Sequence, residues 1–131
     1  MPYLLDANAV IALLENRSAD LARRIRQHAA SDIAISAIVL HELFFGAFKS
    51  RRVAENVQRV DALRFEVLEF DKEDARQAGE VRALLAAAGS LIGPYDMLVA
   101  GQAISRNRVV VTRNTREFAR VPGLRIENWE I

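Results

Sequence analysis

Apolar residues occur in this chain in two kinds of run, and the two kinds alternate from one end to the other. Short apolar runs bounded by polar or turn residues are typical of buried strands. The longer stretches between them repeat apolar residues every three or four positions, as along one face of a helix. The short runs predict strands at Tyr3–Asp6, Ile33–Ile35, Phe65–Phe70, Arg108–Thr112 and Leu124–Ile126. In the third strand, Phe65 and Val67 are expected on the buried face.

The longer stretches predict helices, and residues at their ends support this. Ser18 and Ser36 can each cap a helix start, Gly89 suits a helix end, and Pro94 suits a first turn. The stretch from Ser36 is apolar almost all the way round, which predicts a deeply packed helix. The predicted helices are Ala9–Leu14, Ser18–Ala30, Ser36–Phe48, Val53–Leu63, Asp71–Ala88 and Tyr95–Arg106.

Strands that alternate with helices predict an α/β fold with a parallel sheet between two helical layers, a three-layer α/β/α sandwich. The run at residues 108–112 is continuous and apolar, as in a central parallel strand. The chain has 131 residues and no repeat, low-complexity tract or linker. We therefore expect residues 1–131 to form a single domain.

Three acids stand in apolar surroundings: Asp6 at the end of the first predicted strand, Glu42 within a helix, and Asp96 near the start of another. Burying an unpaired carboxylate costs several kcal/mol, so such acids usually have a cation partner or a catalytic role. Asp6 could instead cap the helix that follows it, and Asp96 could complement a helix dipole. Glu42 is harder to explain structurally, because Ile38, Val39, Phe45 and Gly46 occupy the positions three and four residues away.

Further polar residues follow the predicted strands at the edge where Asp6 lies. Thr112, Asn114 and Glu117 come after the strand at residues 108–112, and Asn8 comes shortly after Asp6. If these two strands are neighbours, their carboxyl ends share one crevice, the usual ligand position in open α/β sheets. Asn8 and Thr112 could orient a water or a phosphate there. Converging acids would form an all-oxygen site for a hard divalent ion, Mg²⁺ or Mn²⁺, of the kind that assists hydrolysis.

Composition excludes several other kinds of chemistry. The chain has no cysteine, which rules out disulfides, thiol catalysis and Cys-based zinc sites. His28 is expected to face solvent, and His41 to be structural. No nucleophile elbow, phosphate-binding lysine loop or dinucleotide fingerprint occurs. No segment is long and apolar enough to span a membrane, so a soluble, cytoplasmic protein is expected.

Four sequence motifs, in order, resemble those of the PIN-domain ribonucleases. They are Asp6-x-Asn8 after the first strand, His41-Glu42-Leu43 within a helix, Ile92-Gly93-Pro94-Tyr95-Asp96 at a helix start, and Val110-Val111-Thr112-Arg113-Asn114 followed by Arg116-Glu117-Phe118 and Val121-Pro122-Gly123-Leu124. Within that superfamily the chain is similar to the VapC toxins of bacterial toxin–antitoxin pairs, over Pro2–Trp129.

The resemblance implies a PIN-like α/β/α fold and a Mg²⁺- or Mn²⁺-dependent endoribonuclease that cuts RNA, often tRNA or rRNA, and so arrests translation. It also implies a homodimer held inactive by a VapB-type antitoxin, whose tail occupies the acidic groove. Asp6, Glu42 and Asp96 match the three core acids. The fourth acidic position of the family corresponds here to Asn114, with Glu117 as the nearest acid.

The basic residues lean strongly toward arginine, since all but Lys49 and Lys72 of the 18 are Arg. Arginine binds phosphate through two parallel hydrogen bonds, although a high-GC coding bias gives the same composition. Arg113, Arg116 and Arg120 follow the strand whose end should form the crevice. We therefore expect these three arginines to hold the RNA backbone.

Two other functional classes stay open on the sequence alone. A receiver-type phosphoacceptor domain also combines a parallel sheet, clustered acids and Mg²⁺, but it needs a lysine after a late strand, where neither lysine lies. A non-catalytic binding or regulatory module is the second alternative, and three intact acids argue against it.

Overall fold

A central sheet of five parallel strands organises the protein, whose computed structural model describes residues 2–131. The strand order is β3-β2-β1-β4-β5. Leu4 in the middle strand pairs with Ala34 on one side and with Val110 on the other. The strands are β1 Tyr3–Leu5, β2 Ile33–Ser36, β3 Glu66–Leu68, β4 Val109–Val111 and β5 Ile126–Glu127. The predicted parallel sheet is confirmed, and β1 and β4 are neighbours.

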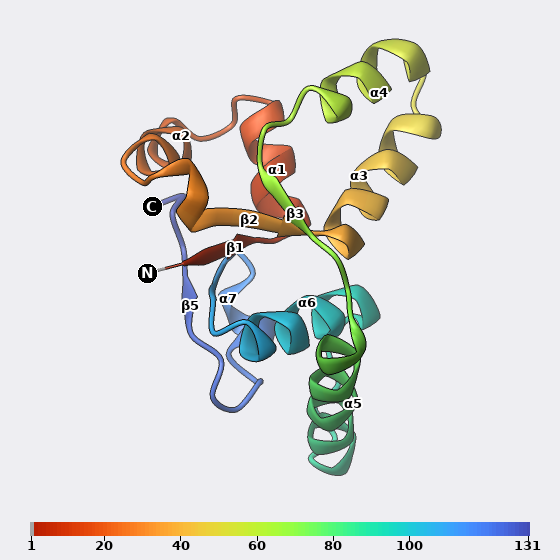
Figure 1. Ribbon diagram of the computed structural model, residues 1–131, viewed down its shortest axis with the longest axis vertical. Helices are drawn as coiled ribbons and strands as arrows, with labels where there is room; N and C mark the ends of the chain where they lie inside the picture. Colours follow the sequence, from red (N-terminus) through yellow and green to blue (C-terminus); the bar gives the residue numbers. More distant parts are fainter. Residues whose placement is uncertain (1) are drawn as a thin grey trace.

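Helices cover both faces of the sheet (Figure 1), which confirms the three-layer α/β/α architecture. Helices α1 to α4 lie on one face, and α5, α6 and α7 lie on the other. The helices are α1 Ala7–Leu14, α2 Ala19–Arg26, α3 Ala37–Phe48, α4 Val53–Asp61, α5 Lys72–Ala87, α6 Pro94–Ser105 and α7 Thr115–Phe118, with a 3₁₀ turn, η1, at Ala30–Asp32. Since α1 follows β1 on one face and α7 follows β4 on the other, the chain reverses its winding between these two strands. That is the position where open α/β sheets bind ligands.

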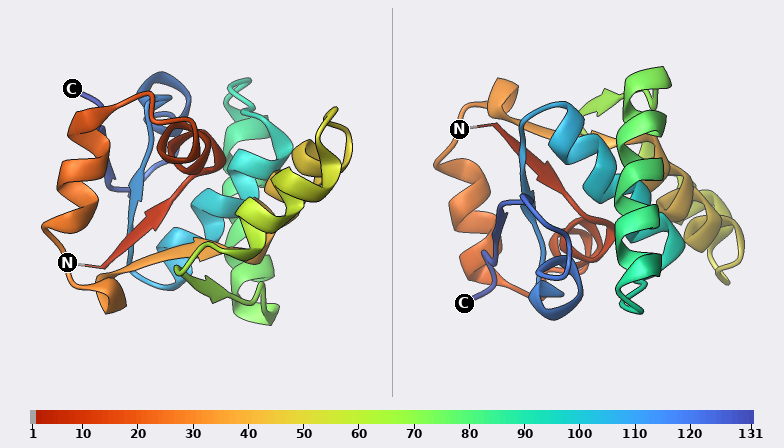
Figure 2. Two further views of the ribbon diagram at one scale, coloured as in Figure 1. Left: turned by 90° about the horizontal axis from the view of Figure 1, so that it is seen from above. Right: turned by 90° about the horizontal axis from the view of Figure 1, so that it is seen from below.

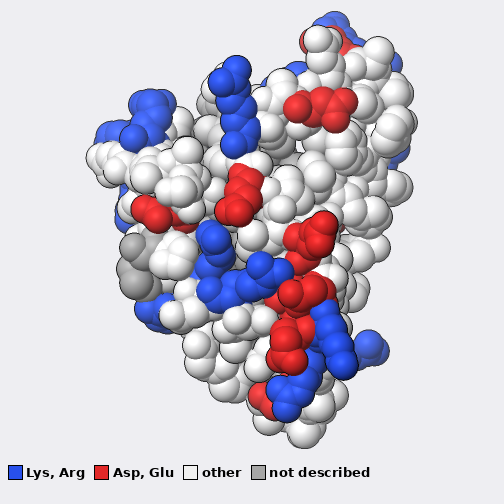
Figure 3. Space-filling view, in the orientation of Figure 1, with Lys and Arg blue, Asp and Glu red and all other residues white. Residues whose placement is uncertain are grey.

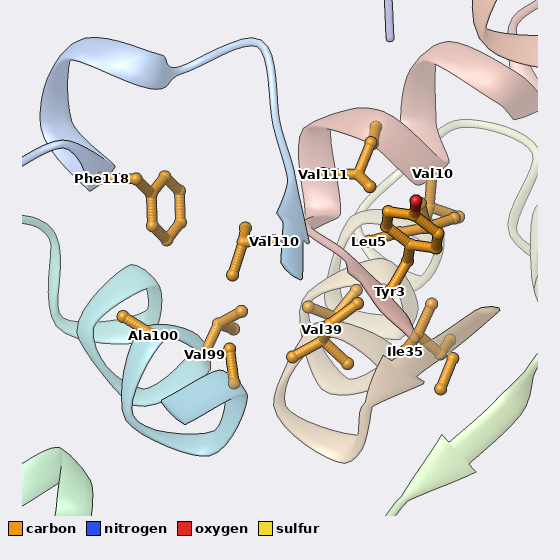
Figure 4. Close-up of a cluster of buried hydrophobic side chains, with 14 of the residues drawn as sticks. Tyr3, Leu5, Val10, Ile35, Val39, Val99, Ala100, Val110, Val111 and Phe118 are labelled. Carbon is orange, nitrogen blue, oxygen red and sulfur yellow. The ribbon is translucent and has the colours of Figure 1, made fainter. Parts of the chain in front are cut away.

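The core lies on both faces of the sheet, because successive residues of a strand point to opposite sides. Figure 4 shows Val110 facing Val99 and Phe118 of the lower helical layer, while Leu5 and Val111 lie toward α1. All five side chains are fully buried or nearly so. The apolar runs of β1, β2 and β4 therefore fold as strands that are buried on both faces.

The predicted helix starts are largely confirmed. Ser18 accepts a hydrogen bond from the Leu21 N–H, and Ser36 accepts one from the Ile38 N–H. Pro94 occupies the first turn of α6. The helix predicted at residues 18–30 ends earlier, at Arg26, and the chain passes through η1 before β2. The short helix α7 was not predicted.

The interpretation of residues 65–70 was wrong in register. Only Glu66–Leu68 forms a strand, at one edge of the sheet, and Val67 is 41% exposed whereas Leu68 is 7% exposed. Pairing with β2 sets this register, because Leu68 lies beside the buried Ser36. The last strand also differs from its prediction and forms at Ile126–Glu127 rather than Leu124–Ile126.

The predicted deep burial of the helix at residues 36–48 was wrong for its second half. Phe45 is 60% exposed and Phe48 is 63% exposed. Figure 2 shows the reason: α3 and α4 form a hairpin that projects away from the sheet, so α4 covers only part of α3. On the face shown in Figure 3, the surface over α3 is mostly uncharged, whereas charged side chains of both signs mix beside α5.

His28 does not face solvent as predicted. Its ring stacks on that of Trp129, with 4.9 Å between centroids and 6° between planes, and it also contacts Tyr3. Trp129 is fully buried. This aromatic group joins the C-terminal segment to β1 and to the end of α2.

The helical hairpin of α5 and α6 is held by an ion pair at one end. Asp74, which is fully buried, accepts hydrogen bonds from Arg106 at 3.1 Å and from Gln102 at 2.9 Å. Burial opposes ionisation of Asp74, but these hydrogen bonds and that of the Asp71 N–H outweigh it and lower the pKa of Asp74 to about 2.

Across residues 2–131, no helix is long and apolar enough to cross a membrane.

Candidate active site

Asp6 lies at the carboxyl end of β1 and is only 2% exposed. One carboxylate oxygen accepts a hydrogen bond from the Ala9 N–H at 2.8 Å, and so caps α1. The other oxygen accepts from the Thr112 hydroxyl at 2.6 Å. The backbone N–H of Asp6 also donates to the Val111 carbonyl oxygen at 3.1 Å. Asp6 is therefore both a helix cap and a residue of the crevice between β1 and β4.

The polar residues after β4 form a short hydrogen-bonded chain. The Thr112 hydroxyl oxygen accepts from the Asn114 N–H at 2.8 Å, and the Asn114 side-chain amide donates to Glu117 at 2.8 Å. Because the only hydroxyl proton of Thr112 is donated to Asp6, we expect Thr112 to act through Asp6 rather than directly on a water or a phosphate.

Glu42, on α3, and Asp96, in the first turn of α6, bring two more carboxylates to this edge. Burial raises the pKa of Glu42, and the charges of Asp96 and Asp6 raise it further. Burial likewise raises the pKa of Asp96, with a further contribution from the charge and hydrogen bond of Glu117. Asp6, Glu42 and Asp96 therefore lie within electrostatic reach of one another, and Glu117 lies within reach of Asp96.

Asp6 has the largest of these shifts. Burial raises its pKa from 3.8 to about 6, against the opposing hydrogen bonds from Thr112 and Ala9, with smaller contributions from the charges of Asp96 and Glu130. Every charged side chain that shifts the pKa of Asp6, Glu42 or Asp96 is itself an acid. We call Asp6, Glu42, Asp96 and Glu117 the acid group; none of them takes part in an ion pair within residues 2–131.

The arginines predicted to hold RNA lie in and around α7, the helix that also carries Glu117 of the acid group. Arg113, Arg116 and Arg120 are all exposed. The Arg120 guanidinium donates to the Leu91 carbonyl oxygen at 3.1 Å, in the loop that leads into α6. Asn8 is also exposed, on the first turn of α1.

Comparison with known proteins decides the family. The family model described as "PIN domain" matches residues 3–124. The chain belongs to the PIN-domain family. This confirms the predicted resemblance and with it the predicted class of enzyme, a nuclease; that all 131 residues form a single domain stays a prediction.

Curated relatives of this PIN domain are ribonucleases of the VapC type. The chain is 42% identical to the tRNA(fMet)-specific endonuclease VapC of Salmonella typhimurium, over 98% of both chains. It is 35% identical to Ribonuclease VapC2 of Rickettsia felis, over 99% of both chains. Among solved structures it matches a DNA-bound VapBC from Salmonella typhimurium with a TM-score of 0.94, 42% identity and 98% of both chains covered. It matches VapBC2 from Rickettsia felis, bound to a promoter DNA fragment, with a TM-score of 0.91 and 34% identity, over 98% of this chain and 99% of that chain.

PIN-domain ribonucleases generally depend on divalent metal ions, and the donor set of the acid group fits such an ion. Its side chains offer only oxygen, and within residues 2–131 none of them is ion-paired. Within residues 2–131, no three His, Asp or Glu side chains lie close enough together to enclose an ion as they stand.

The sequence interpretation missed two features of the helices that carry this site. One is the buried pair of Asp74 and Arg106, which lies at the opposite end of α6 from Asp96 and which no local pattern in the sequence indicates. The other is a pair of aromatic side chains, His41 and Tyr95, each of which directly precedes an acid in the sequence. Their ring centroids lie 5.5 Å apart, joining α3 to α6.

Proposed function

We propose that this PIN domain is a divalent-metal-dependent endoribonuclease that cleaves a tRNA. One observation carries the proposal: four carboxylates from α3, α6, α7 and the end of β1 lie at one sheet edge, and none of them is ion-paired within residues 2–131. Such a group repels itself unless an ion binds. The initiator tRNA is the substrate that the name of the relative at 42% identity suggests.

Asp6, Glu42 and Asp96 would hold Mg²⁺ or Mn²⁺. When bound, the ion lowers the pKa of a water and stabilises negative charge at the scissile phosphate. Glu117 is a better candidate for the fourth acid than Asn114, because Glu117 contacts Asp96 while the Asn114 amide donates to Glu117. Asn114 would then orient Glu117, just as Thr112 orients Asp6.

Asn8 and the arginines would act on the RNA itself. Asn8 is exposed beside Glu42 and can orient a water or a phosphate oxygen. Arg113, Arg116 and Arg120 are exposed around α7 and can contact the RNA backbone. These contacts would position the RNA strand without recognising its bases.

We also propose a VapB-type antitoxin as the partner, because solved relatives at 42% and 34% identity are VapBC complexes. The pair would be a toxin–antitoxin system that acts on translation in the cytoplasm. A homodimer and a larger toxin–antitoxin assembly remain predictions.

The alternatives lack their residues. A receiver-type domain needs a lysine at the end of β4 or β5, and Lys49 lies at the end of α3 while Lys72 opens α5. A non-catalytic module would not need four acids without a balancing cation.

Incubation of the purified protein with initiator tRNA(fMet) and with elongator tRNA(Met), in Mg²⁺ or Mn²⁺, tests the proposal. We expect cleavage of the initiator tRNA at one position and little cleavage of the elongator tRNA. Equal cleavage of both tRNAs would support the nuclease activity but contradict the proposed preference for the initiator tRNA. No cleavage of any tRNA or rRNA in either metal would contradict the proposed function.

A further inference from the structure

A hollow with aromatic walls lies next to the acid group. It is bounded by α1, α3 and the first turn of α6, and its volume of about 570 Å³ is within the range of about 300–1,000 Å³ typical of ligand sites. We call it the ring hollow; the side chains that matter here are Asn8, His41, Glu42, Phe45, Lys49 and Tyr95. Glu42 belongs both to this hollow and to the acid group, so the two are continuous.

The rings of the hollow are exposed to solvent. Tyr95 is 45% exposed and tilts against His41, and Phe45 is 60% exposed. His41, Phe45 and Lys49 follow one another at intervals of four residues, so they share one face of α3. The Lys49 ammonium lies 5.0 Å from the centre of the Phe45 ring. Exposed rings beside a cation are the elements of a single-stranded nucleic-acid site, in which bases stack on rings and cations hold phosphates.

We propose that the ring hollow binds an unpaired base of the RNA next to the scissile phosphate. The base stacks on Tyr95 and Phe45, and Lys49 contacts a flanking phosphate. The base is placed beside the scissile phosphate because Tyr95 directly precedes Asp96 in the sequence and His41 directly precedes Glu42. A phosphate held at the acid group therefore has its neighbouring nucleotide within reach of the rings. This inference rests on the proposed RNA cleavage and adds that the nucleotide beside the cut must be unstacked.

The neighbouring hollow has a different character. It lies between α1, α3 and α4 and is lined mainly by aliphatic side chains, with Arg59 donating to the Leu14 carbonyl oxygen. It offers no aromatic ring to a base. A protein segment is the competing occupant for the ring hollow, and the test below separates the two.

The test compares ring variants on two RNA substrates. The first substrate is an initiator tRNA(fMet) transcript whose cleavage position has been mapped with the wild-type protein; the second is the same transcript with an abasic nucleotide beside that position. The variants are Tyr95→Ala, Phe45→Ala and Tyr95→Phe. Phe48→Ala is the matched control, because Phe48 is an equally exposed phenylalanine on α3 outside the ring hollow.

On the intact transcript, kcat/KM should fall about ten-fold for Tyr95→Ala and for Phe45→Ala, the loss expected when a stacked base loses its ring. Tyr95→Phe and Phe48→Ala should stay near wild type. On the abasic transcript the alanine variants should match wild type, because no base remains to stack. Melting curves of all variants would confirm that each one folds.

Three results would overturn the proposal. The kcat/KM of the alanine variants could fall equally on both transcripts, or it could stay unchanged on the intact transcript. They could also cleave normally but escape inhibition by a VapB-type antitoxin, which would assign the ring hollow to a protein. If wild type shows no metal-dependent cleavage, the proposed function fails and this inference fails with it; if wild type cleaves and the rings do not matter, only this inference fails.

Discussion

Asp6 has structural roles besides the chemistry proposed for it. It caps α1 through one oxygen and receives the Thr112 hydroxyl at the other, so that its carboxylate is fixed in direction. Asparagine caps helices about as well as aspartate, whereas alanine costs about 1 kcal/mol at such a position. Asp6→Asn is therefore the variant that removes the charge and keeps the cap.

The raised pKa of Asp6 predicts how stability depends on pH. Its folded pKa of about 6 lies above the ordinary 3.8, so the fold favours the protonated carboxyl. The stabilising contribution is complete below about pH 4 and is lost as pH rises through about 6. Without metal, wild type should lose about 1–2 kcal/mol from this group between about pH 5 and about pH 8, out of a full effect of about 3 kcal/mol. Denaturant unfolding across this range would measure it, with Asp6→Asn as the reference that lacks the contribution of Asp6 to the slope. Parallel curves for the two proteins would show that Asp6 titrates normally.

Glu117 and Asn114 should differ in what they contribute to metal binding. The Asn114 amide donates to Glu117, so Asn114→Ala should weaken Mn²⁺ binding about ten-fold, as expected on loss of an orienting partner. Glu117→Gln should weaken it more, because it removes a charge from the acid group. Calorimetric titration of Mn²⁺ would rank the two. Asn114→Asp completes the set: if it tightens binding more than Glu117→Gln weakens it, Asn114 and not Glu117 faces the ion.

Helix α6 connects the hairpin with α5 to the acid group, since it carries Asp96 in its first turn. The hairpin depends on close backbone contact at Gly101, where a Cβ atom would lie 2.5 Å from the Cα of Ala78. Gly101→Ala should therefore cost about 1–3 kcal/mol through overpacking. Gly79→Ala on α5 is the matched control: its Cβ would meet open space, and we expect no loss or a gain of up to about 1 kcal/mol. Thermal unfolding would separate them, and equal behaviour of the two variants would mean that the helices can move apart freely.

The segment around α7 is expected to contact the RNA backbone through its arginines. Replacing Arg113 and Arg116 by Ala should reduce the slope of log affinity against log salt by about 1.4, at about 0.7 for each lost phosphate contact on single-stranded RNA. Arg76 and Arg82, exposed on α5, form the control pair, whose replacement should leave the slope unchanged. Equal slopes for the two double variants would place the RNA elsewhere.

For the whole molecule, the features that can be predicted from the sequence are those that depend on the local pattern of apolar and polar residues. Parallel strands were predictable because their runs are apolar on both faces, and Asp6 could be found because it ends one of these runs. Glu42 was detectable by its apolar surroundings within a helix. These signals suffice for the layers of the fold and for Asp6, Glu42 and Asp96, and Glu117 was named because it follows the strand at residues 108–112.

The rest depends on contacts between elements that are distant in sequence. Phe45 and Phe48 are exposed because the α3–α4 hairpin projects away from the sheet. The pattern of apolar residues along a helix does not reveal where the helix lies relative to the sheet. The register of Leu68 is set by its pairing with β2. The pairing of Asn114 with Glu117 requires the unpredicted helix α7, whose Phe118 packs into the core.

The central claim is that the acid group cleaves RNA with a divalent ion. The most direct measurement is the rate of initiator tRNA cleavage by chelator-treated protein as Mn²⁺ or Mg²⁺ is added back, for wild type and for Asp6→Asn, Glu42→Gln and Asp96→Asn, with circular dichroism as the check on folding. We predict no cleavage by wild type in chelator, saturable recovery with metal, and no recovery in the three folded variants. Cleavage that persists in chelator, or full activity in all three variants at saturating metal, would contradict this account.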